Sequence, residues 1–129
     1  MKVDVAEWVM QASSVVALES TIVAHGMPYP DNRETQLACA RAAEQHGATA
    51  ATIAVIDGVA RIGLSSSELE RLSHPDSNFV KAATRDLPAV LARSGNAATT
   101  VSSSAFIAAK VRWPIGLRPR RAPDDRSRN

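Results

Sequence analysis

The chain has 129 residues, of which 45% are hydrophobic and 22% charged. These proportions are typical of one globular domain and exclude collagen, low-complexity disorder and a disulfide scaffold. No segment approaches the roughly 18 consecutive apolar residues that a membrane-spanning helix needs. Asp4 and Glu7 stand where a signal peptide is apolar, and Cys39 is the only cysteine. The sequence therefore indicates a cytoplasmic protein with no membrane partner.

The positive charge is concentrated at the C-terminal end. The whole chain has a net charge of +2, yet residues 110–129 contain seven basic and two acidic residues. The body before them is mildly acidic, and aromatic residues make up only 4% of the chain. A nucleic-acid partner is therefore not expected for the body, because such partners need basic and stacking surfaces. Nucleic-acid binding stays open as an alternative only for the tail, residues 111–129.

Strands and helices alternate along the first half of the chain. In order, we expect a short amphipathic helix at residues 3–12, a buried strand at 14–18, an ordered loop at 24–30 and a long helix at 31–46. Asp31 or Asn32 is expected to cap the long helix, and Gly47 to follow its end. Cys39 lies among alanines in this helix and is expected in the core.

The second half begins with a hairpin signal. Asp57-Gly58 predicts a tight turn between two strands, and Ser65-Ser66-Ser67-Glu68 predicts a capped helix. The two strands beside the turn are expected at residues 51–56 and 59–62. After them we expect a short strand at 79–82, a helix at 86–95, a loop at 95–101 and a last helix at 102–110. This alternation predicts an α/β fold, a layered α/β/α sandwich with a mixed sheet.

Glu19 is the strongest candidate for chemistry. It directly follows the first buried strand, and ligands of open α/β sheets bind at the carboxyl ends of strands. A carboxylate there can transfer protons to a bound ligand. The alternative is an ordinary polar residue at a strand end. Ser20, Thr21 and His25 follow in the adjoining loop and can line a pocket, or His25 can be a solvated or core histidine.

Lys81 and Arg85 are the next candidates. Their spacing of four allows a phosphate clamp, although an ion pair of Lys81 with Asp86 is an open alternative. The loop at 95–100 can present backbone N–H groups to an anion, or it simply starts a helix. One cysteine and three scattered histidines do not make a zinc site.

Five segments of unusual composition follow one another along the chain. They are VALESTIVAHGMPYP at 16–30, GATAATIAVIDG at 47–58, IGLS at 62–65, RDLP at 85–88 and NAATTV at 96–101. Together they resemble the pseudouridine-5′-phosphate glycosidase family, also called indigoidine synthase A-like. The resemblance covers about residues 14–110.

The resemblance implies an enzyme that reversibly cleaves the C–C glycosidic bond of pseudouridine 5′-phosphate to uracil and ribose 5-phosphate. In this family an iminium forms between a lysine and the sugar, and a divalent metal, commonly manganese (Mn²⁺), lies near the phosphate. Glu19 matches the proton-donor glutamate, Lys81 the substrate-binding lysine and Val101 a substrate-contacting position. The family forms homotrimers.

The family pattern stops after Lys110. Val111-Arg112-Trp113-Pro114 departs from it, and no residue of this chain matches the metal-binding aspartate or the iminium-forming lysine. We therefore expect residues 1–110 to be an N-terminal part of the family domain, truncated relative to the family fold. Residues 111–129 would then be a basic Arg/Pro tail, disordered or read out of frame, in a fragment made by a frameshift or a truncation. A non-catalytic phosphosugar-binding or regulatory module is the alternative function.

Overall fold

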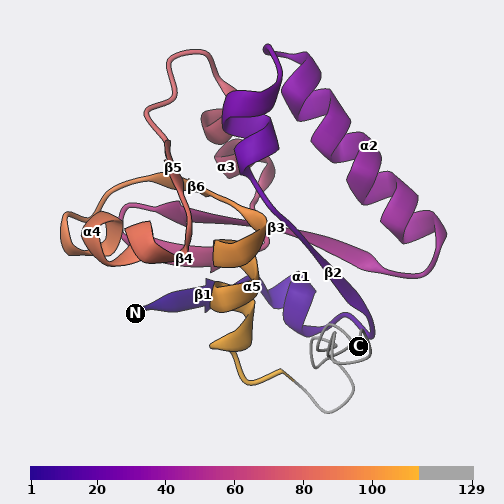
Figure 1. Cartoon of the computed structure of the whole chain (residues 1–129). Helices are drawn as coiled ribbons and strands as arrows, with labels where there is room; N and C mark the ends of the chain where they lie inside the picture. The colour runs from indigo at the N-terminus through magenta and orange to yellow at the C-terminus, as the bar shows by residue number, and fades with distance from the viewer. Residues whose placement is uncertain (114–129) are drawn as a thin grey trace, which may run out of the picture.

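A mixed sheet lies at the centre of the computed structural model, which describes residues 1–113 (Figure 1). The strands of this part of the chain are β1 (Val3–Val5), β2 (Val15–Leu18), β3 (Thr49–Ile56), β4 (Val59–Ile62), β5 (Val80–Ala82) and β6 (Ala97–Thr99). Their order is β1-β4-β3-β6-β5, and β2 pairs with the first half of β3. The pairs β2–β3, β1–β4 and β5–β6 are parallel, whereas β3 is antiparallel to β4 and β6.

Helices cover both faces of this sheet. They are α1 (Glu7–Met10), α2 (Asp31–Gln45), α3 (Ser66–Ser73), α4 (Leu87–Ala92) and α5 (Val101–Ala109), with a π-helical turn at Ile22–Gly26 and a 3₁₀ turn at Thr84–Asp86. In Figure 1, α2 and α3 lie above the sheet and α1 and α5 below it. None of the helices in the described part of the chain has the length and apolar character needed to cross a bilayer.

Strand β3 separates two hydrophobic cores. Ile53 and Val55 pack with α1, α4 and α5, whereas Ile56 packs with α3 and the π-helical turn. Successive side chains of a strand point to opposite faces, so the unbroken apolar run of β3 supplies both cores. The predicted α/β/α sandwich with a mixed sheet is confirmed.

Two short strands, β1 and β6, form where the sequence predicted a helix and a loop. Residues 3–12 form β1 and only one turn of helix, because Val3 and Val5 pair with the free edge of β4. The expected loop at 95–101 contains β6, whose small residues Ala97 and Ala98 fit between β3 and β5. Both strands have only three residues, which is too short to mark a strand locally, and β6 begins with two alanines.

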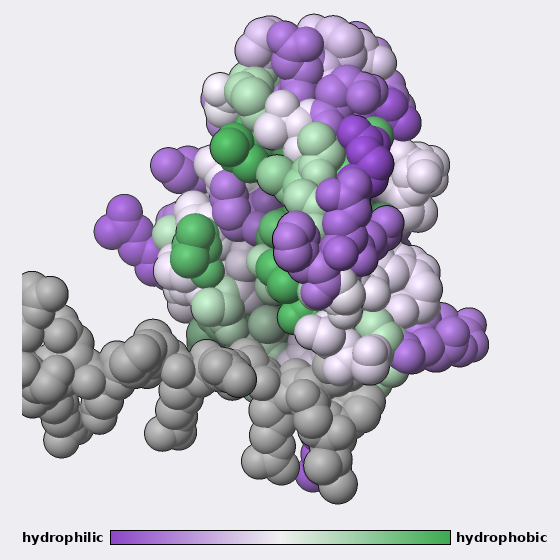
Figure 2. Space-filling model, turned by 90° about the vertical axis from the view of Figure 1, so that its right-hand side faces the viewer, coloured by the Kyte–Doolittle hydropathy of each residue, from purple (hydrophilic) through white to green (hydrophobic). Residues whose placement is uncertain are grey.

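Exposure also differs from the predicted pattern at two places. Strand β2 forms as expected but is not buried: Val16 is 43% exposed, because β3 is the only strand that β2 pairs with in residues 1–113. Figure 2 views the molecule from the right-hand side of Figure 1, and it shows hydrophobic side chains among polar ones on that side. Cys39 is exposed rather than in the core: the buried residues of α2, Asn32 and Gln36, both lie in the first half of the helix.

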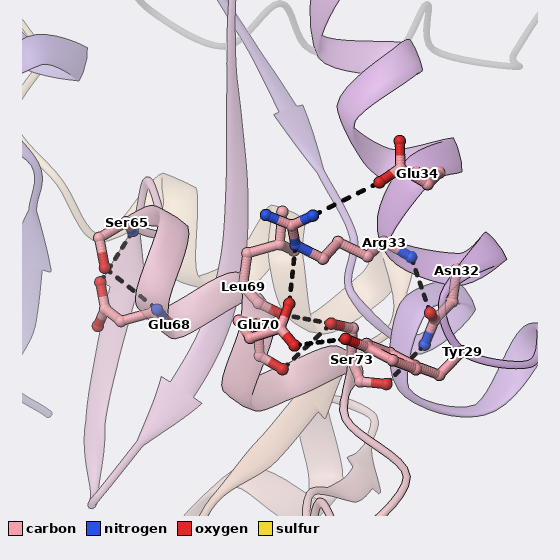
Figure 3. A network of polar contacts seen from close by, with 9 residues as sticks. All are labelled: Tyr29, Asn32, Arg33, Glu34, Ser65, Glu68, Leu69, Glu70 and Ser73. Carbon is pink, nitrogen blue, oxygen red and sulfur yellow. Dashed lines mark hydrogen bonds and ion pairs between the residues drawn. The ribbon is translucent and has the colours of Figure 1, made fainter.

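The long helix α2 was predicted correctly, but its cap was not. Asp31 and Asn32 are its first residues, and no side chain caps it. Asn32 instead is buried, and its Nδ2 donates to the carbonyls of Val23 at 2.8 Å and Ser73 at 2.9 Å. These bonds join α2 to the π-helical turn and to α3, and Figure 3 shows the second of them, from Asn32 to Ser73. Asn32 is therefore an internal cross-link, since buried carbonyls need partners.

The predicted hairpin and the capping box of α3 are confirmed. Asp57 and Gly58 both have positive φ, 50° and 78°, as a two-residue turn between antiparallel strands requires. The Ser65 side chain accepts from the Glu68 amide, and the Glu68 carboxylate accepts from the Ser65 amide (Figure 3). These local signals are strong because each satisfies backbone groups within a few residues.

We expect Gly58→Ala to destabilise the fold more than Gly47→Ala. Both glycines have φ near +80°, but a Cβ at Gly58 would lie 2.8 Å from Ser94 Cα, whereas a Cβ at Gly47 meets nothing within 4 Å. Left-handed strain costs each variant about 1–2 kcal/mol, and the clash adds about 1–3 kcal/mol only at Gly58. Urea unfolding measures both; equal losses would contradict the packing of the turn against Ser94.

A second polar cluster joins α2 to α3 at the surface. The Tyr29 hydroxyl donates to Glu70 Oε1 at 2.7 Å, and Arg33 Nε lies 2.9 Å from Glu70 Oε2 (Figure 3). The hydrogen bond to the Glu70 carboxylate is the main reason that the pKa of Tyr29 is raised above its ordinary value. The fold thus favours the neutral phenol.

The single tyrosine of the chain makes this contact measurable. We expect the phenolate absorbance of the folded protein to appear above the usual midpoint of about pH 10, and to return toward it in Glu70→Ala. Because the folded pKa is raised, the contact stabilises the fold below the unfolded pKa and is lost as pH rises through the folded one. Glu44→Ala, at an exposed site of α2, is the control; an unshifted midpoint in wild type would contradict the hydrogen bond.

Candidate active site

Strands β2 and β6 run toward each other along one edge of β3. Leu18 of β2 pairs with Thr52, and Ala98 of β6 pairs with Ala54. Their carboxyl ends meet at Ile53, where the Ser20 amide donates to the Thr99 carbonyl at 3.0 Å. Helix α5 begins two residues after Thr99. Carboxyl ends of strands beside a helix N-terminus are where α/β sheets bind ligands.

Glu19 lies at this meeting point, as the sequence predicted from its place after a strand. It is half-buried, and its Oε2 accepts from the Thr21 amide at 2.9 Å. Its backbone carbonyl accepts from the buried Gln36 side chain of α2 at 3.3 Å. Gln36 also donates to the Thr52 hydroxyl at 2.9 Å. Glu19 is thus held from β3 and α2 while part of the residue remains exposed.

Lys81 lies on β5, the strand next to β6. It pairs with Ala98 and is exposed. Asp86, the alternative ion-pair partner, instead accepts from the Ala83 amide at 2.9 Å. Within residues 1–113 no ion pair involves Lys81 or Glu19. Arg85 is exposed on the following 3₁₀ turn.

Val101 is the first residue of α5 and is 74% exposed. Thr100 caps this helix, and its side chain accepts from the Ser103 amide. The Ser103 hydroxyl donates to the carbonyl of Ala82, next to Lys81, at 2.7 Å. The first turn of α5 therefore joins the end of β6, which meets the Glu19 segment, to the end of β5, which carries Lys81.

The other sequence candidates have different surroundings. Ser20 is fully buried, and the Thr21 hydroxyl donates to the Thr99 carbonyl at 2.9 Å. His25 is exposed at the end of the π-helical turn. Sequence reasoning placed Thr99 in a possible anion-binding loop and Ser103 among helix caps, but it missed their buried contacts, which depend on strand order. A separate groove of about 530 Å³ between α4 and α5 contains none of Glu19, Lys81 and Val101.

The residues of the described part of the chain do not form a metal centre. In residues 1–113 no three His, Cys, Asp or Glu side chains are grouped closely enough to hold an ion. At the strand junction, Glu19 Oε2 already accepts from the Thr21 amide. This part of the chain does not fit the manganese that the resemblance implies.

A family model described as indigoidine synthase A like protein matches residues 4–115. The chain belongs to this family.

Curated relatives and solved structures agree with the assignment of this chain to the indigoidine synthase A like family. Pseudouridine-5′-phosphate glycosidases of Hahella chejuensis and Escherichia coli are each 50% identical over 95 residues, which are 74% of this chain but 31% and 30% of theirs. The Arabidopsis thaliana enzyme is 48% identical over 83% of this chain and 32% of its own. The chain thus spans about a third of the length of these relatives.

Two solved structures share the fold of this family member. The indigoidine synthase A-like protein of Thermotoga maritima superposes with a TM-score of 0.75 at 28% identity, over 90% of this chain and 37% of that one. The prealnumycin C-glycosynthase AlnA, solved in complex with ribulose 5-phosphate, gives 0.71 at 31% identity, over 83% and 35%. The family expected from the five sequence segments is thereby confirmed.

Proposed function

We propose that this chain forms part of the catalytic site of a pseudouridine-5′-phosphate glycosidase. The supporting observation is the junction at which Glu19, Lys81 and Val101 are carried by adjoining strand ends and the first turn of α5. The curated relatives bear this enzyme's name, and AlnA was solved with a pentose phosphate. The substrates are pseudouridine 5′-phosphate or, in reverse, uracil and ribose 5-phosphate.

Each residue has a role in this proposal. Breaking the C–C bond leaves an electron pair on a uracil carbon, and the Glu19 carboxyl group supplies the proton that this carbon needs. In the reverse direction the Glu19 carboxylate takes the proton back. The Lys81 ammonium group, free of an ion pair within residues 1–113, binds the phosphorylated sugar. Val101 contacts the substrate at the start of α5.

Complete catalysis needs more than these residues. The chain spans about a third of its relatives' length, and we propose that the iminium-forming lysine and the metal ligand belong to the remaining two thirds of the family sequence. That part can be supplied by the same polypeptide or by a second one. A phosphosugar-binding module without catalysis is the alternative, favoured by Lys81, which is exposed and makes no ion pair with any of residues 1–113.

Calorimetry with ribose 5-phosphate tests the binding half of the proposal on the full 129-residue chain. We expect saturable binding that Lys81→Met weakens about tenfold or more, because a charge-assisted bond to phosphate is lost. Lys2→Met, which removes an exposed lysine before β1, should leave the affinity unchanged. Absence of heat at millimolar ribose 5-phosphate would rule out binding by this chain alone.

An activity assay separates the enzyme from the binding module. Residues 1–110 are joined to the part of the Escherichia coli relative that lies outside its region of similarity. Chromatographic detection of uracil from pseudouridine 5′-phosphate, with manganese present, supports the enzyme. A folded chimera that binds ribose 5-phosphate but releases no uracil supports the binding module instead.

A further inference from the structure

Thr99 lies fully buried where β2, β3, β6 and α5 meet. Its hydroxyl donates to the Ile53 carbonyl at 2.6 Å. The hydroxyls of Ser104 and Ser20 lie 2.8 Å and 3.2 Å from the same oxygen. Three elements that are far apart in sequence are therefore joined at one side-chain atom.

The directions of these hydrogen bonds follow from the number of protons. A threonine hydroxyl has one proton, and a carbonyl can only accept. Since the Thr99 proton goes to Ile53, both serine hydroxyls must donate to Thr99 Oγ1. Ser20 Oγ in turn accepts from the Thr99 amide at 2.8 Å. The network is closed, and none of its hydroxyl protons is left to pass to a ligand or to Glu19.

The backbone of Thr99 holds the segment that contains Glu19. Its carbonyl accepts from the Ser20 amide at 3.0 Å and from the Thr21 hydroxyl at 2.9 Å. The Thr21 amide donates to Glu19 Oε2 at 2.9 Å. Residues directly bonded to Thr99 therefore follow Glu19 and orient its carboxylate. On the other side of Thr99, Val101 is only two residues away.

We propose that Thr99 is a positioning residue, which fixes the Glu19 carboxylate relative to the first turn of α5 through its closed hydroxyl network. The role of Glu19 itself rests on the proposed function. Thr99 never touches the ligand: it is buried, and its polar atoms are all used within the protein. Its hydroxyl sets where the two proposed site residues, Glu19 and Val101, lie relative to each other.

Amide hydrogen exchange on the full chain tests this proposal without a ligand. In Thr99→Val, which keeps the shape but removes the hydroxyl, we expect the Ser20 and Thr21 amides to exchange about tenfold faster or more. Thr99→Ser keeps the hydroxyl and should restore slow exchange. The Leu69 amide, which donates to Ser65 in the distant helix α3, should change by less than about threefold.

Two results would overturn the positioning role. Equal acceleration at Leu69 would mean that Thr99 only stabilises the whole fold, and unchanged exchange at Ser20 and Thr21 would mean that other contacts hold the segment. If Thr99→Val does not fold, Ser20→Ala replaces it, because that variant keeps the bonds of Thr99 to Ile53 and Ser104 and is expected to accelerate Thr21 exchange in the same way.

Ribose 5-phosphate separates this proposal from the proposed function. Calorimetry on the same variants should show affinity lost in Thr99→Val by about tenfold or more and retained in Thr99→Ser. A wild-type chain that binds no ribose 5-phosphate contradicts binding by the chain alone, while the exchange rates still decide how Glu19 is held. Localised exchange with unchanged affinity would show that the network orders the segment without positioning a binding residue, and this outcome also overturns the proposal.

Discussion

Glu19→Gln is expected to lower uracil release by about 10²–10⁴-fold in the chimera with the Escherichia coli relative, the range typical of a lost general acid–base group. Glutamine keeps the size of the side chain but cannot exchange a proton. In Glu19→Gln the amide oxygen can still accept from the Thr21 amide, as Glu19 Oε2 does. The local structure should therefore survive, and the loss should fall on kcat rather than on KM.

Glu44→Gln is the matched control for this measurement. Glu44 is an exposed acid of α2, and its substitution removes the same charge far from the strand junction. We expect its uracil release to match wild type. Activity of Glu19→Gln within about threefold of wild type would exclude proton transfer by Glu19 and would favour a binding role for the junction.

Elements with local signals were predictable from the sequence. The hairpin at Asp57-Gly58 follows from two residues that tolerate positive φ, and the helix after Ser65 from a capping box that closes within three residues. The location of Glu19 at the end of β2 followed from one rule about strand ends. Its catalytic role, like those of Lys81 and Val101, stays a prediction.

What the sequence did not reveal depends on contacts between distant residues. Strand β6 exists because β3 and β5 flank it, and its three small residues carry no strand signal. Ser20 was assigned to a pocket, but 79 positions separate it from Thr99, the residue that buries its hydroxyl. The same is true of Asn32, which resembles a helix cap until α3 is packed beside it.

Only the first residues of the predicted tail belong to the described structure. Residues 114–129 lie outside the described part of the chain, and so does most of the predicted basic tail at 111–129. Its first residues are described: Val111 and Trp113 pack against the core, and Trp113 Nε1 donates to the Ala108 carbonyl at 2.8 Å. Apolar contacts therefore continue past Lys110, and the family model likewise matches beyond it, as far as residue 115.

Ile53→Ala is expected to be the most destabilising single change, by about 2–5 kcal/mol. Ile53 is completely buried, with 0% solvent exposure. It lies at the centre of β3, within the core shared with α1, α4 and α5. Truncation leaves a cavity directly beneath the point where β2 and β6 meet. The loss should therefore also loosen the junction that holds Glu19, and ribose 5-phosphate binding should weaken together with stability.

Ile22→Ala removes the same atoms at the surface and serves as the control. Ile22 is 43% exposed on the π-helical turn, so we expect a loss below about 1 kcal/mol. Urea unfolding followed by circular dichroism measures both variants, with the slope m compared to confirm that the same surface unfolds. Equal losses would mean that the β3 core is not closed in solution. A large loss confined to Ile53 would show that the strand junction is built on a packed core.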